Sequence, residues 1–218
     1  DSRYILVLEN GQPVTGRFNN RVDLNQVSIN NIKKIEITKG PGSAVYGTDA
    51  MGGVINIITE DPGELPSLGL GYRASSFGGT PSGIYSEPVN STIRGSVVLP
   101  IKTITLSNDI TYQQFTKGQQ FEYISADQID KLNLNTDLSW RRLNHEAYIS
   151  HQYFGQKDKG ATRLSSGTVL YTNATVIDRS QLTLTHSWKI KETSSVHQTI
   201  RKANYIREYE VKNNDGQL

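Results

Sequence analysis

The chain has 218 residues, of which 35% are hydrophobic and 20% are charged, and its formal net charge is +2. This length allows one or two packed domains, and no run of lysine or arginine reaches the length typical of a nucleic-acid-binding patch. Cysteine is absent, which excludes disulfide frameworks, thiolate zinc sites and cysteine nucleophiles, and no apolar stretch approaches the roughly 20 residues of a membrane-spanning helix.

The first 60 residues contain short apolar segments separated by loops, a pattern that indicates a small mixed α/β unit. Tyr4–Leu8 and Ile32–Ile37 are predicted strands, and Asn10-Gly11 has the chemistry of a tight turn. The segment from Val22 to Ile32 is predicted to form a helical turn or a short helix between them.

The most informative segment is Gly40–Thr59, where two glycine turns lead directly into the apolar strand Val54–Ile58. A phosphate-binding loop needs glycines that lead into a helix N-terminus, and a P-loop also needs a Gly-Lys-Ser/Thr ending. Neither feature is present. The glycines therefore indicate backbone bends and points of close approach beside a buried strand.

Gly40–Thr59 resembles the end of the plug domain of TonB-dependent outer-membrane receptors, whose pattern is close to Gly-Pro-x-Ser-x-x-Tyr-Gly-x-x-Ala-x-Gly-Gly-Val-Ile-Asn-Ile-Ile-Thr. Every fixed position of that pattern is met. Two upstream segments, Ile5–Val14 and Ile32–Ile37, resemble further strands of the same plug and occur in the same order. The resemblance covers about the first quarter of the chain.

This resemblance implies structural roles for the motif residues, with Asn56 in the terminal strand of the plug and Glu36 pairing with a base on the barrel wall. It also implies that the first half of the plug and a TonB-contacting box precede Asp1 in a longer protein, because neither is recognisable here. The residues expected to hold the plug fold are Gly40, Pro41, Ser43, Tyr46, Gly47, Gly52, Gly53, Asn56 and Glu36.

After a Pro/Gly-containing linker at 61–66, the pattern changes to strict alternation of polar and apolar residues. Leu132–Arg141, Gln181–Ile190 and Ile104–Tyr112 each place apolar side chains on one face and polar side chains on the other. Strands of about 9 to 11 residues with this alternation are what an outer-membrane β-barrel needs. The aromatic candidates for the membrane-interface girdles, with ordinary packing as the alternative, are Trp140, Tyr148, Tyr153, Phe154 and Trp188.

The connections between these strands are predicted to alternate in length. Short turns are expected near 100–102, 143–144 and 178–180, and long loops at about 76–91, 117–131 and 155–167. Roughly eight strands follow the linker, against about 22 in a plugged transporter. We therefore expect a small α/β plug remnant (1–60), a linker (61–66) and the first strands of an incomplete antiparallel transmembrane β-barrel (67–218). A soluble β-sandwich is the alternative that alternation alone leaves open.

No catalytic or metal-binding motif is apparent. The histidines, at 145, 151, 186 and 197, lack metal-site spacing and are expected on different strands, and no Gly-x-Ser-x-Gly elbow occurs. Glu122, Asp127 and Asp130 are acidic residues near one predicted loop, but they lack the ligand spacing of a calcium loop. We therefore expect a non-enzyme without a cofactor or a resident metal.

The candidate ligand-binding segment follows Pro13-Val14. In cobalamin and catecholate-siderophore receptors of the resembled family, the matching plug loop reaches the outer face and touches substrate. Its residues here suit that role, because arginines meet anionic oxygens, a phenyl ring stacks and amides donate hydrogen bonds; the alternative is a polar loop with no ligand. The candidates are Arg17, Phe18, Asn19, Asn20 and Arg21.

The resemblance thus implies a fragment of a receptor that imports a metal chelate across the outer membrane of a Gram-negative bacterium. A ferric siderophore is the leading ligand class, cobalamin the next, and haem is less favoured because no histidine-bearing motif is present. The implied partners are the TonB energy-transducing protein, the chelate and outer-membrane lipid, and not nucleic acid. A structural or adhesive β-rich envelope protein without transport activity is the alternative function.

Overall fold

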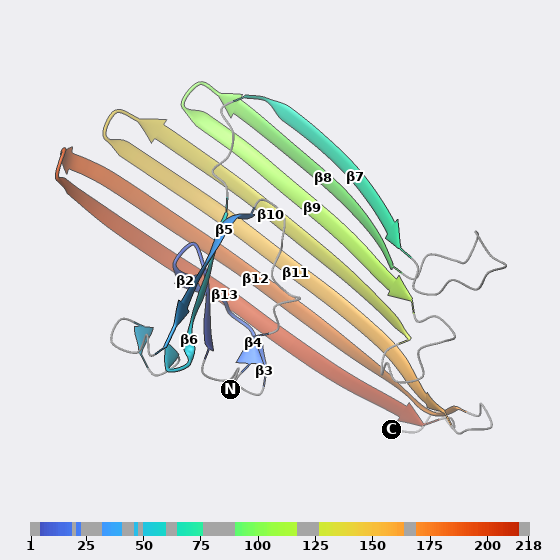
Figure 1. Cartoon of the computed structure of the whole chain (residues 1–218). Coiled ribbons are helices and arrows are strands. Elements are labelled where there is room, and N and C mark those ends of the chain that lie inside the picture. Colours follow the sequence, from blue (N-terminus) through green and yellow to red (C-terminus); the bar gives the residue numbers. More distant parts are fainter. Residues whose placement is uncertain are drawn as a thin grey trace. The chain divides into compact units, whose positions relative to one another are not determined.

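The computed structural model describes residues 5–18, 21–22, 32–40, 46–47, 50–59, 65–75, 90–116, 127–163 and 169–213, with backbone only at 17–18 and 21–22. The chain forms two compact units, Asp1–Pro62 and Gly63–Leu218, and each is treated by itself below (Figure 1).

The first unit contains a four-stranded sheet with the order β2-β1-β6-β5. β1 pairs in parallel with β6, while the β1–β2 and β5–β6 pairs are antiparallel. A separate two-stranded ribbon joins β3 to β4. The strands are β1 (Ile5–Glu9), β2 (Gln12–Pro13), β3 (Arg17–Phe18), β4 (Arg21–Val22), β5 (Ile32–Lys39) and β6 (Gly53–Thr59).

β1 is buried on both faces, as its continuous apolar sequence requires. Leu6 and Leu8 form one core cluster with Ala50 and Val54. Val7, which points to the opposite face, forms a second cluster with Val14 and Ile57. The core of this unit therefore lies on either side of the β1–β6 pair.

The two-residue turn between β1 and β2 is Asn10-Gly11, with φ values of 50° and 77°. Positive φ at both positions is characteristic of the type I′ hairpin turn, for which Asn-Gly is the favoured sequence. The expected helical segment falls mostly on residues 23–31, which lie outside the described ranges. Val22 at its start belongs instead to strand β4, and the described ranges contain no helical element.

The second unit is a seven-stranded antiparallel sheet in which each strand pairs with its neighbours in sequence (Figure 1). The expected antiparallel, strand-dominated architecture is confirmed, and the sheet is not closed into a barrel. Its strands are β7 (Ser67–Ser75), β8 (Asn90–Ile101), β9 (Ile104–Thr116), β10 (Gln128–Arg142), β11 (His145–Arg163), β12 (Val169–Lys191) and β13 (Ser194–Asn213).

One rim of this sheet consists of two-residue turns at 102–103, 143–144 and 192–193. The expected turns near 100–102 and 143–144 are therefore close to their observed places. The expected long loop at 155–167 is wrong in extent, because β11 continues to Arg163. The described residues after the linker form seven strands rather than eight, and these strands run from 9 to 23 residues, so several exceed the expected length.

The expected turn at 178–180 is wrong, because these residues lie within β12. Each of the three has a partner on the neighbouring strand β11. Asp178 accepts a hydrogen bond from the Tyr153 hydroxyl at 2.6 Å, and the Ser180 hydroxyl lies 3.2 Å from His151. Arg179 lies over the ring of Phe154. Contacts with the neighbouring strand allow these three polar side chains to lie in the middle of a strand. Three consecutive polar residues therefore do not form a turn here.

Candidate functional site

The candidate ligand segment is built on the ribbon formed by β3 and β4. Phe18 and Arg21 pair across this ribbon, as do Arg17 and Val22. Asn19 and Asn20, which connect the two strands, lie outside the described residues, so three of the five candidates are placed by their backbone alone.

The chain that leads into this ribbon is tied to the sheet of the first unit. The Val14 amide donates a hydrogen bond to the Val7 carbonyl at 2.9 Å. Gly16, which the sequence analysis did not single out, is buried and has a φ of 97°. A positive φ at a buried position favours glycine, because no side chain is then strained or crowded.

Three glycines of the motif have positive φ: Gly40 at 96°, Gly47 at 79° and Gly53 at 134°. A Cβ on Gly53 would lie 2.6 Å from the carbonyl oxygen of Thr38 on β5, whereas a Cβ on Gly47 would meet nothing within 4 Å. Gly53 therefore permits close approach of two backbones, while Gly40 and Gly47 permit bends. Gly52 and Tyr46 are exposed, and Pro41 and Ser43 lie outside the described residues.

Asn56 and Asn10 join the three strands β1, β6 and β5 at one end of the sheet. The Asn56 Oδ1 accepts a hydrogen bond from the Gly11 amide at 2.9 Å, and its Nδ2 donates to Glu36 at 3.4 Å. The Asn10 side chain in turn donates to the Thr59 hydroxyl at 2.9 Å and accepts from the Thr59 amide at 3.0 Å. The asparagine of the Val-Ile-Asn-Ile-Ile strand thus holds the β1–β2 turn.

Replacing Asn56 with alanine removes the acceptor for the Gly11 amide. We expect the hydrogen of this amide to exchange with solvent faster. The free energy of unfolding of the plug should fall by about 1 kcal/mol, the typical net value of one hydrogen bond. Hydrogen exchange followed by mass spectrometry measures this change. Asn56→Asp combined with Glu36→Gln, which keeps an acceptor oxygen without setting two carboxylates against each other, should retain most of the protection; equal exchange in the Asn56→Ala protein and in this variant would contradict the role.

Glu36 is paired within its own strand. The Lys34 ammonium lies 2.7 Å from its carboxylate. This hydrogen bond and the lysine charge, together with the hydrogen bond from Asn56, lower the pKa of Glu36 below its ordinary value of 4.5. Lys34 was not predicted as a partner, because only the strand geometry shows that residues two apart on β5 share a face.

We expect Lys34→Ala to raise the pKa of Glu36 toward 4.5. Because the folded-state pKa is the lower one, the stabilisation by this carboxylate is present above the unfolded value and is lost as the pH falls through the folded value. Carboxyl-selective NMR titration measures the change. Lys33→Ala is the control, and a pKa of Glu36 that responds equally to both substitutions would refute the specific pairing.

In the second unit the two faces of the sheet differ in chemistry. One face, the apolar face, contains the row Leu106–Leu138–Ile149–Leu184–Ile200, in which each residue pairs directly with the next across the sheet. These side chains are at least partly exposed. The alternating segments of the sequence therefore present one common apolar face, to which Leu132, Leu134, Thr136, Leu138 and Trp140 all belong.

The opposite face, the polar face, holds every buried side chain among the described residues of this sheet. Apart from Phe154 and Ile177, these buried side chains are polar or charged. In a water-soluble sandwich the apolar face would be the buried one. The polar and charged members are Ser107, Asp109, Thr111, Ser150, Gln156, Arg179 and Gln181.

Aromatic side chains lie toward both ends of the apolar face. Trp140 and Trp188 are near the short-turn rim, Tyr72 and Tyr112 are toward the opposite ends of their strands, and Tyr153 is in the middle of β11. Of the expected girdle residues, Tyr148 and Phe154 lie instead on the polar face, because their cross-strand partners Thr185 and Arg179 belong to it. Ordinary packing, the alternative, applies to Phe154, which is fully buried.

The histidines are less scattered than expected, since His145 and His151 share β11. His145 Nδ1 lies 3.2 Å from His186 Nε2, and its ring stacks on Trp188. His197 lies between the hydroxyls of Ser187 and Ser195, each at 2.9 Å. Within the ranges the structure covers, no three potential ligands gather into a metal site. Asp130 is occupied by hydrogen bonds from Tyr112, Gln114 and Gln128, and Glu122 lies outside those ranges.

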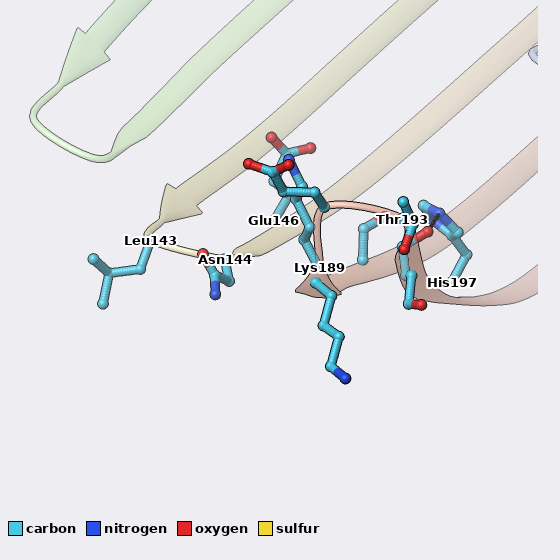
Figure 2. Close-up of a pocket in the computed structure, with 11 residues that line it drawn as sticks. Leu143, Asn144, Glu146, Lys189, Thr193 and His197 are labelled. Carbon is cyan, nitrogen blue, oxygen red and sulfur yellow. Dashed lines mark hydrogen bonds between the residues drawn. The ribbon is translucent and has the colours of Figure 1, made fainter.

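Figure 2 shows a shallow pocket at the short-turn rim, between the turns at 143–144 and 192–193. Its lining includes Glu146 from β11, Lys189 from β12 and His197 from β13, together with Leu143 and Thr193 of the two turns. Side chains of both charge signs line it beside open solvent. Among the described residues no helix is long and apolar enough to cross a membrane.

Comparison with known proteins identifies the first unit. Residues 1–54 match the family model described as the TonB-dependent Receptor Plug Domain. The sequence of residues 1–54 therefore has the pattern of a TonB-dependent receptor plug. The resemblance carried by the glycine motif is thereby confirmed. A curated relative, the vitamin B12 transporter BtuB of Photobacterium profundum, is 42% identical over 64 residues, which are 29% of this chain and 11% of that protein.

Solved structures extend the likeness beyond the plug. The siderophore receptor PirA from Pseudomonas aeruginosa matches 95% of this chain with a TM-score of 0.65 and 18% identity, over 34% of its own length. The siderophore receptor PiuA from Acinetobacter baumannii matches 98% of this chain with a TM-score of 0.66 and 16% identity, over 30% of its own length. At these identities the match shows a shared fold. The chain spans about a tenth of the curated relative and about a third of each solved receptor.

Proposed function

We propose that the chain is part of an outer-membrane receptor of a Gram-negative bacterium that binds and imports a metal chelate. A ferric siderophore is the leading cargo and cobalamin the next. In this proposal residues 1–60 are the C-terminal part of the plug, 61–66 are a linker and 67–218 are the first strands of the barrel wall. The TonB protein supplies energy through a segment outside this sequence.

One observation carries this proposal: the plug sequence is joined to a sheet that exposes apolar side chains and buries polar ones. From Ile104 to Tyr112, β9 rises roughly 26 Å along its axis at about 3.3 Å per residue. At a strand tilt of about 35–45° this length projects to roughly 19–22 Å, which covers most of an apolar band of about 25 Å backed by a polar lumen. Trp140 lies at the Ile104 end of that span, and Tyr72 lies in the row of Tyr112 at its other end.

The candidate ligand residues follow the same proposal. The proposed ligand residues are Arg17, Phe18, Asn19, Asn20 and Arg21, of which Phe18 and Arg21 pair on the β3–β4 ribbon. A phenyl ring, guanidinium groups and amides are the chemical groups that would bind such a chelate. The glycines at 40, 47 and 53 would permit the backbone bends and the close approach on which the plug fold depends. Glu36 would either keep its ion pair with Lys34 or pair instead with a basic residue of the barrel wall.

The test is uptake in the cell that carries the full-length gene. Deleting the gene should reduce uptake of radiolabelled ferric siderophore or cobalamin, and removing the TonB protein should reduce it to the same level. Arg17→Gln with Arg21→Gln should weaken chelate binding by the purified receptor, while Lys33→Gln on β5 should not. Unchanged growth and uptake in metal-poor medium after deletion would favour the structural or adhesive alternative.

A further inference from the structure

Basic and aromatic side chains gather on the apolar face of the seven-stranded sheet, at the short-turn rim. Arg142 and His145 are paired residues that flank the turn at 143–144, and Trp188 lies directly opposite His145 on β12. The next row on the same face contains Trp140 and His186. All five side chains are at least partly exposed. We call them the rim cluster: Trp140, Arg142, His145, His186 and Trp188.

The two histidines of the rim cluster form a unit that offers a hydrogen-bond donor. His145 Nδ1 lies 3.2 Å from His186 Nε2, and the His145 ring stacks on Trp188 with 5.6 Å between the ring centroids. In such a bond one ring donates and the other accepts, and a neutral ring that accepts carries its own proton on the remaining nitrogen. The pair therefore always presents an N–H group that the shared bond does not use.

Arg142 gives the rim cluster a permanent positive charge. Its neighbour Arg141 lies on the polar face and is paired with Glu146 at 2.8 Å, whereas Arg142 forms no ion pair with any residue that the structure describes. The two cross-strand rows of the cluster contain no acidic residue along their described length. An anion is the complementary partner of such a surface.

The row that follows the rim cluster, further from the turns, is apolar. It contains Leu138, Ile149 and Leu184 on the same face. Successive rows on one face are two residues apart, so an apolar row, a row with an indole and an imidazole, and a row with a guanidinium follow one another within about 13 Å. A phospholipid presents matching groups in the same order, from acyl chain through ester to phosphate.

We propose that the rim cluster binds the phosphate of an anionic phospholipid. Arg142 and the histidine pair donate hydrogen bonds to the phosphate oxygens, since arginine recognises phosphate through several donors, and the indole N–H groups of Trp140 and Trp188 face the ester groups. The inference rests on the proposed barrel wall, which places this face in the membrane, and adds a headgroup site to it. A zwitterionic headgroup binds less well, because the two rows offer no carboxylate to its ammonium group.

The experiment measures lipid binding by the purified full-length receptor in detergent, with each lipid titrated and the complexes resolved by native mass spectrometry. The probes are phosphatidylglycerol, phosphatidylethanolamine and monogalactosyl diacylglycerol with the same acyl chains, each with and without excess inorganic phosphate. The test variant is Arg142→Gln with His145→Gln. The control is Arg141→Gln with His197→Gln, which removes the same two residue types from the polar face at the same rim.

We expect phosphatidylglycerol to bind tightest and the galactolipid weakest. The Arg142/His145 variant should bind phosphatidylglycerol about tenfold more weakly, of which roughly fivefold comes from the lost arginine charge. The control should change this affinity by less than about twofold, as is usual for exposed groups that do not contact the ligand. Inorganic phosphate should not displace the lipid, because the apolar row contributes to its binding.

Three results would overturn the inference: phosphatidylglycerol that binds no tighter than the other lipids, an Arg142/His145 variant that behaves like the control, or displacement of the lipid by inorganic phosphate. Each leaves the barrel wall and chelate uptake intact. Failure of all three lipids to bind, together with equal destabilisation by arginine on either face of β12, would instead reject the wall. Thermal unfolding of each variant separates lost binding from lost folding, and the comparison of lipids on the unmodified receptor needs no variant.

Discussion

Leu184→Arg is expected to lower the stability of the receptor in lipid by about 2–4 kcal/mol, the range for arginine on the lipid side of a β-barrel near the midplane. Leu184 lies on the apolar face, in one row with Ile149 and Ile200. If lipid covers this row, the guanidinium is transferred from water into hydrocarbon. The measurement is the urea midpoint of the full-length receptor refolded into phosphatidylcholine vesicles.

Thr185→Arg is the matched control, because it places the same charge one residue along β12 on the polar face, between Tyr148 and Thr199. We expect it to change the free energy of unfolding by less than about 1 kcal/mol, as is usual for a polar site in contact with water. Equal effects of the two substitutions would mean that lipid does not contact the apolar face. That result would favour the envelope protein without a transmembrane wall.

Gly53→Ala is expected to disrupt the plug and to lower its free energy of unfolding by roughly 3 kcal/mol or more. The new methyl group would lie 2.6 Å from the carbonyl oxygen of Thr38, and the φ of 134° is one that alanine rarely adopts. Backbone strain of this kind costs about 1–3 kcal/mol before the clash is counted. Hydrogen exchange of the β5 and β6 amides in the full-length receptor should show the loss of their pairing.

Gly47→Ala separates backbone strain from steric clash as the cause of the effect. The φ of Gly47, 79°, is also positive, but a Cβ there meets nothing within 4 Å. We expect a cost of about 1–2 kcal/mol, the penalty of left-handed backbone alone. Protection in β5 and β6 should then remain close to that of the unmodified protein. If Gly53→Ala is no worse than Gly47→Ala, close approach of the two backbones is not what position 53 requires.

Much of the first unit was predictable because its signals are local. Asn10-Gly11 specifies a tight turn by its own dihedral preferences, and the apolar run of Tyr4–Leu8 indicates a buried strand. Gly16 and Lys34 were missed for the opposite reason. A lone glycine before a polar loop carries no distinctive pattern, and the partner of Glu36 depends on which β5 residues share a face.

In the second unit the sequence predicted the alternation but not the ends of the strands. Asp178, Arg179 and Ser180 have the composition of a turn, yet Tyr153, Phe154 and His151 on the next strand provide their contacts. For Phe154 the sequence left a girdle position and ordinary packing both open, because an aromatic residue suits either face, and only the register decides. Likewise, one cross-strand row of the polar face joins residues more than 100 positions apart, from Arg73 to Arg207.

The plug motif, its bends and the two unlike faces along each strand can be recognised in the amino-acid sequence, since these depend on dihedral preference and on a two-residue period. Which residues lie opposite one another follows from the fold alone, because strand register is set by pairing between distant segments. That pairing gathers single apolar residues into one exposed face. The proposed membrane surface follows from it.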